Sequence, residues 1–243
     1  MQRVKLDATD STNAYLKKLM ATEKVQDFTV VTANNQLSGR GQRGAQWESE
    51  AGKNLTFSVL RYFENFRIQE QFALNIIASL AVYKTLKKLF IPNLYVKWPN
   101  DIMSGNNKIC GILIENNLKN DLIKSSIIGI GLNVNQMDFG KLNKASSLKR
   151  ITGRTIDLDE VLTAILDNLK VLFEEFTPGK VHGIREQYES FLFRKDKPST
   201  FRDSNSKLVT GYIRGITEEG KLVVEFEDAI FKEFGFKELE LLH

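Results

Sequence analysis

The chain has few of the residues that build disulfides and metal sites. Its 243 residues include one cysteine, Cys110, and two histidines, His182 and His243. A single cysteine cannot form a disulfide within the chain and is typical of a reducing compartment, so we expect a cytoplasmic protein. Neither histidine lies near a cysteine in the sequence, so we expect no zinc site and no other metal site built by the protein.

Long apolar runs and concentrated charge are also missing. No uninterrupted apolar stretch approaches the roughly 20 residues that span a bilayer, and residues 1–5 lack the apolar core of a signal peptide. The 34 basic and 30 acidic residues leave a net charge of +4 that is spread along the chain. Nucleic-acid binding normally requires a concentrated basic stripe, so neither a membrane nor DNA is expected as a partner.

Hydrophobic periodicity predicts an α+β unit followed by a small β unit. Helices are expected over residues 11–20, 69–90, 157–176 and 181–193. Strands are expected over residues 28–33, 54–62, 94–98 and 123–134, with a hairpin over 101–115. Short alternating strands follow at residues 208–214, 221–227 and 230–234, a pattern typical of a small SH3-like β-barrel. We place the domain boundary between residues 1–194 and 195–243.

A loop rich in glycine and arginine is the first candidate for chemistry. Residues 39–44 read Gly-Arg-Gly-Gln-Arg-Gly. The glycines allow a backbone to approach a ligand closely, and the arginines supply donors suited to phosphate or carboxylate. Taken alone, the segment is equally consistent with an exposed hairpin loop whose arginines are solvated, because it matches neither the Walker loop nor the dinucleotide fingerprint.

The segment Lys-Trp-Pro-Asn-Asp over residues 97–101 is the second candidate. Lys97 ends an apolar strand and is well placed to direct its ammonium into a site. Asp101 could orient a lysine or a metal, or cap a turn. The simpler interpretation is a strand end with Pro-Asn turn chemistry and a lysine whose head group reaches water.

Glycines interrupt two apolar strands. Gly111 follows Cys110, which we interpret as a packing residue, and a glycine within a strand often marks the close approach of a ligand or of another backbone. Gly129 and Gly131 alternate, so one face of their strand is bare and could form the floor for a flat ligand. Tight packing of a helix would explain the same pattern. Asn133 could bond a heterocycle edge or a neighbouring backbone.

The order of these segments is more specific than any one of them. Ser-Thr-Asn at residues 11–13, the loop at 39–44, Lys-Trp-Pro-Asn-Asp at 97–101, Lys-x-x-Gly-Ile-Leu-x-Glu at 108–115 and Gly-x-Gly-x-Asn at 129–133 together resemble the biotin–protein ligase family. The match covers roughly the first 150 residues. The resemblance implies a class II synthetase-like biotin/lipoyl ligase catalytic domain, with a mixed sheet and helices, followed by an SH3-like β-barrel.

The same resemblance implies an activity and its substrates. The chain would be an ATP-dependent biotin–[acetyl-CoA-carboxylase] ligase that uses biotin, ATP and Mg²⁺. Its partner would be a biotin carboxyl carrier protein or domain, and the enzyme would be a monomer or a homodimer. Some family members carry an N-terminal DNA-binding domain, but this chain begins almost at the Ser-Thr-Asn triplet, so DNA binding is not expected.

The resemblance also implies roles for individual residues. The implied catalytic residues are Lys97, Arg40 and Arg43. The implied biotin-binding residues are Ser11, Thr12, Asn13, Gln36, Gly39, Arg40, Gly41, Gln42, Lys97, Gly111 and Gly129. The implied ATP- and adenylate-binding residues are Arg40, Arg43, Trp47, Asn100, Lys108, Gly131 and Asn133. Gln42 stands where many members have arginine, so retention of the adenylate is expected to depend more on Arg43 and Lys97.

Two other functions compete with this interpretation. A lipoate–protein ligase shares the fold and the two-step logic, but the triplet and the glycine–arginine loop favour biotin. A non-catalytic module could use the C-terminal β unit to bind peptide or RNA. Against it, Phe226, Phe231, Phe234 and Phe236 alternate as core residues should.

Overall fold

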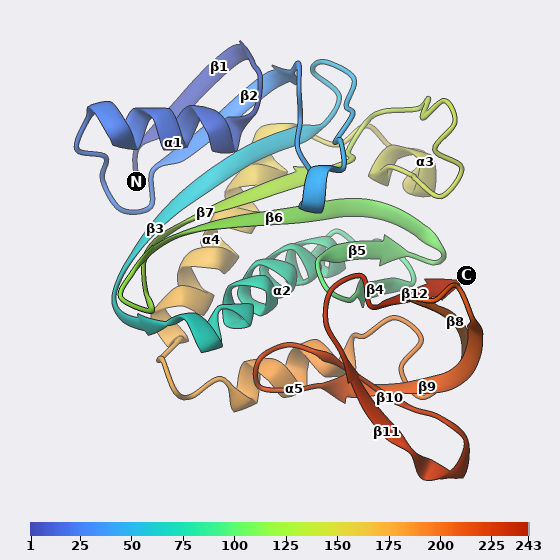
Figure 1. The fold of residues 1–243 in the computed structure, drawn as a ribbon. Helices are drawn as coiled ribbons and strands as arrows, with labels where there is room; N and C mark the ends of the chain where they lie inside the picture. Colours follow the sequence, from blue (N-terminus) through green and yellow to red (C-terminus); the bar gives the residue numbers. More distant parts are fainter. Residues whose placement is uncertain (243) are drawn as a thin grey trace.

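The computed structural model describes residues 1–242 except for the side chain of Arg43, so the prediction made on His243 lies outside the described residues. The described chain forms a seven-stranded sheet in the order β1-β2-β3-β7-β6-β5-β4 and a five-stranded sheet in the order β11-β10-β9-β8-β12 (Figure 1). Helices cover the first sheet. The predicted α+β class is therefore confirmed.

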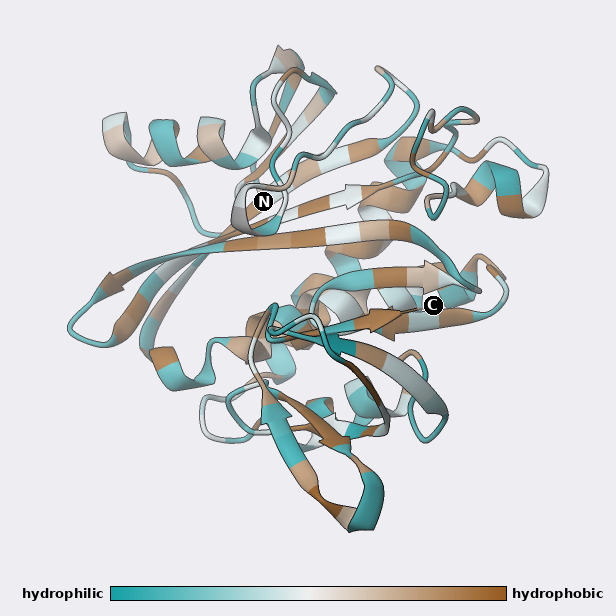
Figure 2. Ribbon diagram, turned by 45° about the vertical axis from the view of Figure 1, so that its right-hand side comes forward, coloured by the Kyte–Doolittle hydropathy of each residue, from teal (hydrophilic) through white to brown (hydrophobic). Residues whose placement is uncertain are grey.

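The first sheet is mixed, because β1 runs parallel to β2 and every other pair is antiparallel. Its strands are β1 (Arg3–Thr9), β2 (Val30–Gln36), β3 (Leu55–Arg67), β4 (Leu94–Lys97), β5 (Asp101–Ser104), β6 (Asn107–Lys119) and β7 (Leu122–Leu132). Nearly all of β7 is buried, as its apolar sequence predicts. Figure 2 shows hydrophobic residues along the middle strands of this sheet.

Five α-helices and three short 3-10 helices accompany the sheets in the described residues, and the α-helices carry most of the packing. They are α1 (Thr12–Thr22), α2 (Phe72–Lys88), α3 (Leu148–Thr152), α4 (Leu158–Glu175) and α5 (His182–Ser190). The Asp157 side chain caps α4, accepting a hydrogen bond from the Glu160 backbone N–H at 2.9 Å. Ser11 precedes α1 but makes no such side-chain cap.

The two faces of the first sheet pack against different helices. Leu16 of α1 packs with Leu60 and Ile127 on one face, whereas Val59 and Ile128 lie in the larger core with α2 and α4 on the opposite face (Figure 1). Side chains alternate between the faces of a strand. Ile127, Gly129 and Gly131 of β7 therefore face α1, and the part of this strand that lacks side chains lies on that side.

The second sheet is entirely antiparallel. It consists of β8 (Pro198–Asp203), β9 (Leu208–Ile216), β10 (Leu222–Glu225), β11 (Phe231–Phe234) and β12 (Leu239–Leu242). Phe226, Phe234 and Phe236 pack against the core, as predicted. Phe231 is 59% exposed, so its predicted place in the core is wrong.

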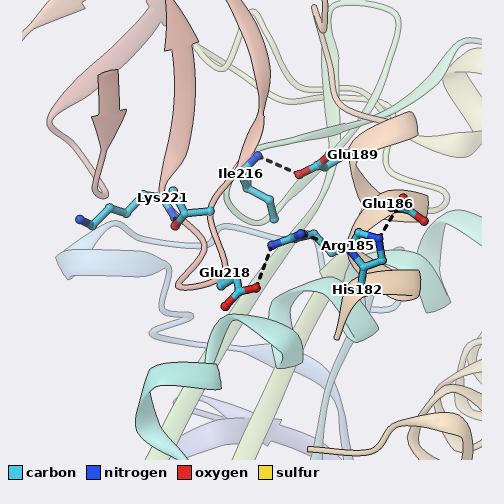
Figure 3. Close-up of polar contacts among 8 residues, drawn as sticks. His182, Arg185, Glu186, Glu189, Ile216, Glu218 and Lys221 are labelled. Carbon is cyan, nitrogen blue, oxygen red and sulfur yellow. Dashed lines mark hydrogen bonds and ion pairs between the residues drawn. The ribbon is translucent and has the colours of Figure 1, made fainter. Parts of the chain in front are cut away.

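The turn between β9 and β10, residues 217–221, fastens the second sheet to the rest of the molecule. Trp98 Nε1 donates to the Gly220 carbonyl at 2.8 Å. Gly220 has φ +85°, and a Cβ there would lie 2.0 Å from Phe72 of α2. Figure 3 shows Arg185 of α5 reaching Glu218, at 3.9 Å between Nη1 and Oε1. Buried side chains continue without a break from the first sheet into the second.

Within residues 1–242, no helix combines the length and the apolar character required to cross a bilayer.

Candidate active site

A cavity of about 180 Å³ opens where α1, the loop after β2 and the glycine-bearing parts of β6 and β7 meet. The following predicted residues line it: Ser11, Thr12, Asn13, Gln36, Arg40, Gly41, Gln42, Trp47, Asn100, Lys108, Gly111, Gly129 and Gly131. The structure therefore brings together segments that are far apart in the sequence. Gly39, Lys97 and Asn133 are not among the lining residues.

One end of the cavity is a network of polar side chains. Gln36 Oε1 accepts from Thr12, at 2.9 Å from its backbone nitrogen and 3.2 Å from its hydroxyl. The Ser58 hydroxyl lies 2.7 Å from Thr12 Oγ1 and 2.6 Å from Asn13 Oδ1. Asn13 Nδ2 donates to Glu115 Oε2 at 2.8 Å. Such a network holds donors and acceptors in fixed directions, which suits recognition of a small polar ring.

Sequence analysis missed two members of this network. Ser58 is a fully buried hydroxyl in the apolar strand β3, and Glu115 ends the Lys-x-x-Gly-Ile-Leu-x-Glu segment. A lone serine inside an apolar strand is the signal that could have identified Ser58, because a buried hydroxyl needs a partner.

Gly129 must lack a side chain because Asn13 lies directly over it. A Cβ at Gly129 would be 2.4 Å from Asn13 Oδ1. Gly129 and Gly131 both line the cavity, and side chains of the protein itself rest on the strand face that these glycines leave bare. Because Asn13 belongs to α1, the contact at Gly129 also matches the alternative of tight helix packing.

The Trp47 side chain covers the part of the cavity floor that Gly111 and Gly131 form. A Cβ at Gly131 would be 2.4 Å from the indole of Trp47, and one at Gly111 would be 3.0 Å from it. The indole Nε1 is buried and has no hydrogen-bond partner among the described residues. An unpaired buried donor is unfavourable, which suggests that a ligand acceptor belongs near this nitrogen.

The glycine–arginine loop is a tight hairpin over the cavity. The Trp47 backbone N–H donates to the Gly39 carbonyl at 2.9 Å, and a Cβ at Gly39 would be 2.3 Å from the Trp47 oxygen. Gly39 therefore closes the hairpin, whereas Arg40 and Gln42 line the cavity. The side chain of Arg43, a predicted catalytic residue, lies outside the described part of the chain.

Two predicted lysines face different cavities. Lys108 lines the cavity, and its ammonium lies 2.7 Å from Asp101 Oδ1 and 5.6 Å from the centre of the Trp47 ring. Lys97 lines another hollow, of about 460 Å³, between the β4–β5 hairpin and the second sheet. Burial lowers the pKa of Lys97, and attraction to Asp101 opposes the shift.

Asn133 and Cys110 are buried and lie outside the cavity lining. Asn133 is buried, and its Nδ2 donates to the Ser146 carbonyl at 3.0 Å, so its amide is engaged by backbone. Cys110 is fully buried, and burial raises the pKa of its thiol. A buried neutral thiol is a poor nucleophile, in agreement with the predicted packing role of Cys110.

The chain is similar to known proteins in sequence and in structure. Residues 6–133 match the model of the biotin/lipoate A/B protein ligase family. A bifunctional ligase/repressor BirA of Bacillus spizizenii is 30% identical over 217 residues; the match covers 88% of this chain, which spans 66% of that protein's length. A biotin–[acetyl-CoA-carboxylase] ligase of Paracoccus denitrificans is 28% identical over 226 residues, covering 90% of this chain and 92% of that protein.

The solved structures agree with the sequence relatives. The biotin protein ligase from Aquifex aeolicus in complex with biotin and ATP superimposes with a TM-score of 0.82 at 28% identity, covering 100% of this chain and 99% of that chain. The matched residues 6–133 contain the triplet, the glycine–arginine loop and the glycine strands that form the cavity. On this evidence, the chain belongs to the biotin/lipoate A/B protein ligase family.

Proposed function

We propose that the chain is an ATP-dependent biotin–protein ligase that biotinylates a lysine of a biotin carboxyl carrier domain. The observation that carries the proposal is a single cavity that joins the Thr12–Gln36–Ser58–Asn13 network to the Lys108 cation. The network would supply directed hydrogen bonds for a polar ring, and the cation would reduce the repulsion between a carboxylate and a phosphate bound beside it.

The reaction has two steps. First, a carboxylate oxygen of biotin attacks the α-phosphorus of ATP, the bond to the bridging oxygen breaks, and pyrophosphate leaves. Second, the neutral amine of the acceptor lysine attacks the carbonyl carbon, the bond to the phosphate oxygen breaks, AMP leaves, and the amine loses a proton to solvent. Neither step requires a covalent enzyme intermediate, so binding and charge stabilisation are the main contributions of the protein.

Each part of the cavity then has a task. Ser11, Thr12, Asn13 and Gln36 would bind the biotin ring, and Trp47 with Gly131 would face the adenylate. Lys108 would reduce the repulsion between carboxylate and α-phosphate. Arg40 would contact phosphate from the loop. Lys97, which lines the neighbouring hollow, would contribute to the field at Asp101 without lining the cavity itself.

Magnesium would enter with ATP. Among the described residues, no group of three or more histidine, cysteine, aspartate or glutamate side chains could hold a metal ion. Mg²⁺ is commonly held by substrate phosphates, waters and one or two carboxylates, and Asp101 is the carboxylate in the cavity lining. The donor set therefore fits a magnesium ion bound through ATP, which would neutralise phosphate charge.

Three further predictions belong to this proposal. The enzyme would work in the cytoplasm, because its carrier and ATP are available there. Residues 1–243 would not bind DNA. The enzyme would act as a monomer or a homodimer, which sedimentation at several concentrations would distinguish.

The deciding experiment is ATP–pyrophosphate exchange by the purified protein with biotin, with lipoate and with neither. We expect exchange only with biotin. Exchange with lipoate alone would move the chain to the lipoate-activating branch of its family. Absence of exchange with either acid would refute adenylation and leave a binding module.

A further inference from the structure

A hollow of about 130 Å³, smaller than both spaces described above, adjoins the main cavity. It lies where the glycine–arginine loop, α2, β6 and the second sheet meet. It is lined by Gln42, Gln71, Phe72, Asn75, Ile114, Asn116, Glu219 and Phe236. Gln42 also lines the main cavity, so the two spaces lie on either side of one loop residue. We refer to this space as the acceptor hollow.

The acceptor hollow contains a buried oxygen without a partner. Asn75, in α2, is 8% exposed, and its Oδ1 forms no hydrogen bond within the described chain. Buried amide oxygens are nearly always paired in folded proteins, and leaving one unpaired is unfavourable. The orphan oxygen indicates that a hydrogen-bond donor binds in the acceptor hollow.

Glu219 adds a negative charge at the mouth of the same hollow. Hydrogen bonds from its own backbone and from the Thr217 side chain hold the pKa of its carboxyl below the ordinary value, so it is ionised at neutral pH. Lys221 also attracts this carboxylate, but its ammonium pairs with Glu233 at 3.5 Å. None of the described side chains that line the hollow is cationic.

The turn that carries Glu219 is held in place on both sides. Figure 3 shows Glu218 directed to Arg185, and Glu189 Oε1 accepting from the Ile216 backbone N–H at 3.0 Å. On the other side, the Gly220 carbonyl accepts from Trp98. A carboxylate on such a fixed turn is preorganised, so little ordering is required when it binds a cation.

We propose that the acceptor hollow binds the ammonium group of the carrier's acceptor lysine, with the Glu219 carboxylate and Asn75 Oδ1 as its acceptors. An ammonium offers three donors and one positive charge, which match an anionic rim and an unpaired oxygen. The proposal rests on the proposed ligase function. It places the lysine beside the adenylate before the ammonium loses its proton and the amine attacks.

The test separates the two half-reactions. Glu219→Gln removes the charge and retains the shape, and Asn75→Leu removes the orphan oxygen at similar volume. Glu218→Gln is the matched control, because it removes an exposed carboxylate from the same turn outside the hollow. It leaves intact the two hydrogen bonds that hold the turn, from the Ile216 backbone N–H to Glu189 and from Trp98 to the Gly220 carbonyl. Transfer is measured with a purified biotin carboxyl carrier domain and with Nα-acetyl-lysine methylamide, and adenylate formation is measured by pyrophosphate exchange and by capture with neutral hydroxylamine.

We expect Glu219→Gln to raise KM for both lysine acceptors about tenfold, the scale of one lost charge-assisted contact. Asn75→Leu should shift KM in the same direction without lowering Tm, because it removes an unpaired oxygen. Exchange and hydroxylamine capture should persist in both variants, since neither residue lines the main cavity, and Glu218→Gln should resemble the wild type.

Unchanged KM in Glu219→Gln and Asn75→Leu, with exchange intact, would overturn the acceptor hollow and leave the ligase proposal standing. An equal KM rise in Glu218→Gln would also overturn it, because the effect would then come from the turn as a whole. Lack of biotin-dependent exchange in the wild type would instead overturn the proposed function.

Discussion

Asp101 lines both the main cavity, which also contains Lys108, and the hollow that contains Lys97. We expect the two lysines to contribute unequally to adenylate formation. The resemblance assigns the catalytic cation to Lys97, whereas the structure places the Lys108 ammonium in the cavity. We expect Lys108→Ala to reduce biotin-dependent exchange by about 100-fold or more, as loss of a preorganised charge does. Lys97→Ala should reduce it by less than about tenfold, because a charge outside the cavity acts only at a distance. The reverse order in exchange assays would restore Lys97 as the main cation.

Lys97 also affects stability, because burial lowers its pKa. In the unfolded chain the pKa of this lysine is about 10.4, and in the folded chain it is lower. Between these two pKa values the unfolded chain binds more protons than the folded chain. The charged lysine therefore lowers the free energy of unfolding at neutral pH. This loss becomes smaller as the pH rises above the pKa of the folded chain, and it is gone above the pKa of the unfolded chain. Lys97→Met should thus be more stable than the wild type in urea at pH 7, with a smaller gain at pH 10. Lys24→Met, at an exposed position, reports the effect of losing a surface charge alone, and equal gains at both pH values would contradict this account.

Trp47 rests on Gly111 and Gly131, where a flat ligand would bind. We expect addition of ATP and biotin to move the indole and change its fluorescence, because its buried Nε1 would gain an acceptor. The chain has two tryptophans, so a Trp47→Phe variant measures the signal that remains from Trp98. A ligand-induced change of the same size in Trp47→Phe would show that Trp47 does not respond.

At the scale of elements, Gly220 determines how the second sheet meets α2. Ala there would combine a left-handed backbone with a Cβ 2.0 Å from Phe72. We expect Gly220→Ala to lower the free energy of unfolding by about 3 kcal/mol. Gly105→Ala is the control, because Gly105 has φ +57° and no atom within 4 Å of its virtual Cβ. It should lose only about 1 kcal/mol in the same urea titration, and equal losses would mean that the contact with Phe72 contributes nothing.

The elements with strong periodicity could be predicted from the sequence, and the others could not. The apolar spacing of α2 and the largely apolar sequence of β7 identify both elements. β1 alternates charged with apolar residues and is largely exposed, so its short apolar pattern is weak. β8 begins at Pro198 and β12 lies at the end of the described chain. Their strand structure depends on pairing with distant segments, since β8 pairs with both β9 and β12. The short helix α3 carries no periodic signal at all.

The site shows the same division. Motif order identified the triplet, the loop and the glycine strands, because close backbone approach requires those residue types. The network partners Ser58 and Glu115 depend on which strands are neighbours, and a single sequence does not state this. The role that the resemblance implies for Lys97 stays a prediction. In the structure Lys97 lines the hollow beside the second sheet, whereas Lys108 lines the cavity, and a single sequence does not state the direction in which a strand end points.

At the scale of the molecule, buried side chains run from the first sheet through α5 into the second. We propose that residues 1–194 and 195–243 are two units in architecture, but we expect them to unfold together. Urea denaturation followed by tryptophan fluorescence and by far-ultraviolet circular dichroism should give coincident, single transitions. Two separate transitions would show that the second sheet is an independent folding unit.

Trp98 lies within a motif that would be interpreted as catalytic, yet its indole is hydrogen-bonded to Gly220, 122 positions further along the chain. Gly220 does not line the main cavity. A substitution at Gly220 that breaks this hydrogen bond would displace the segment that carries Asn100 and Asp101, which line the cavity. A genetic screen that scores only biotinylation would therefore group such a substitution with substitutions in the cavity itself. If the chain has the proposed activity, a loss-of-function map would therefore include residues that do not contact a substrate.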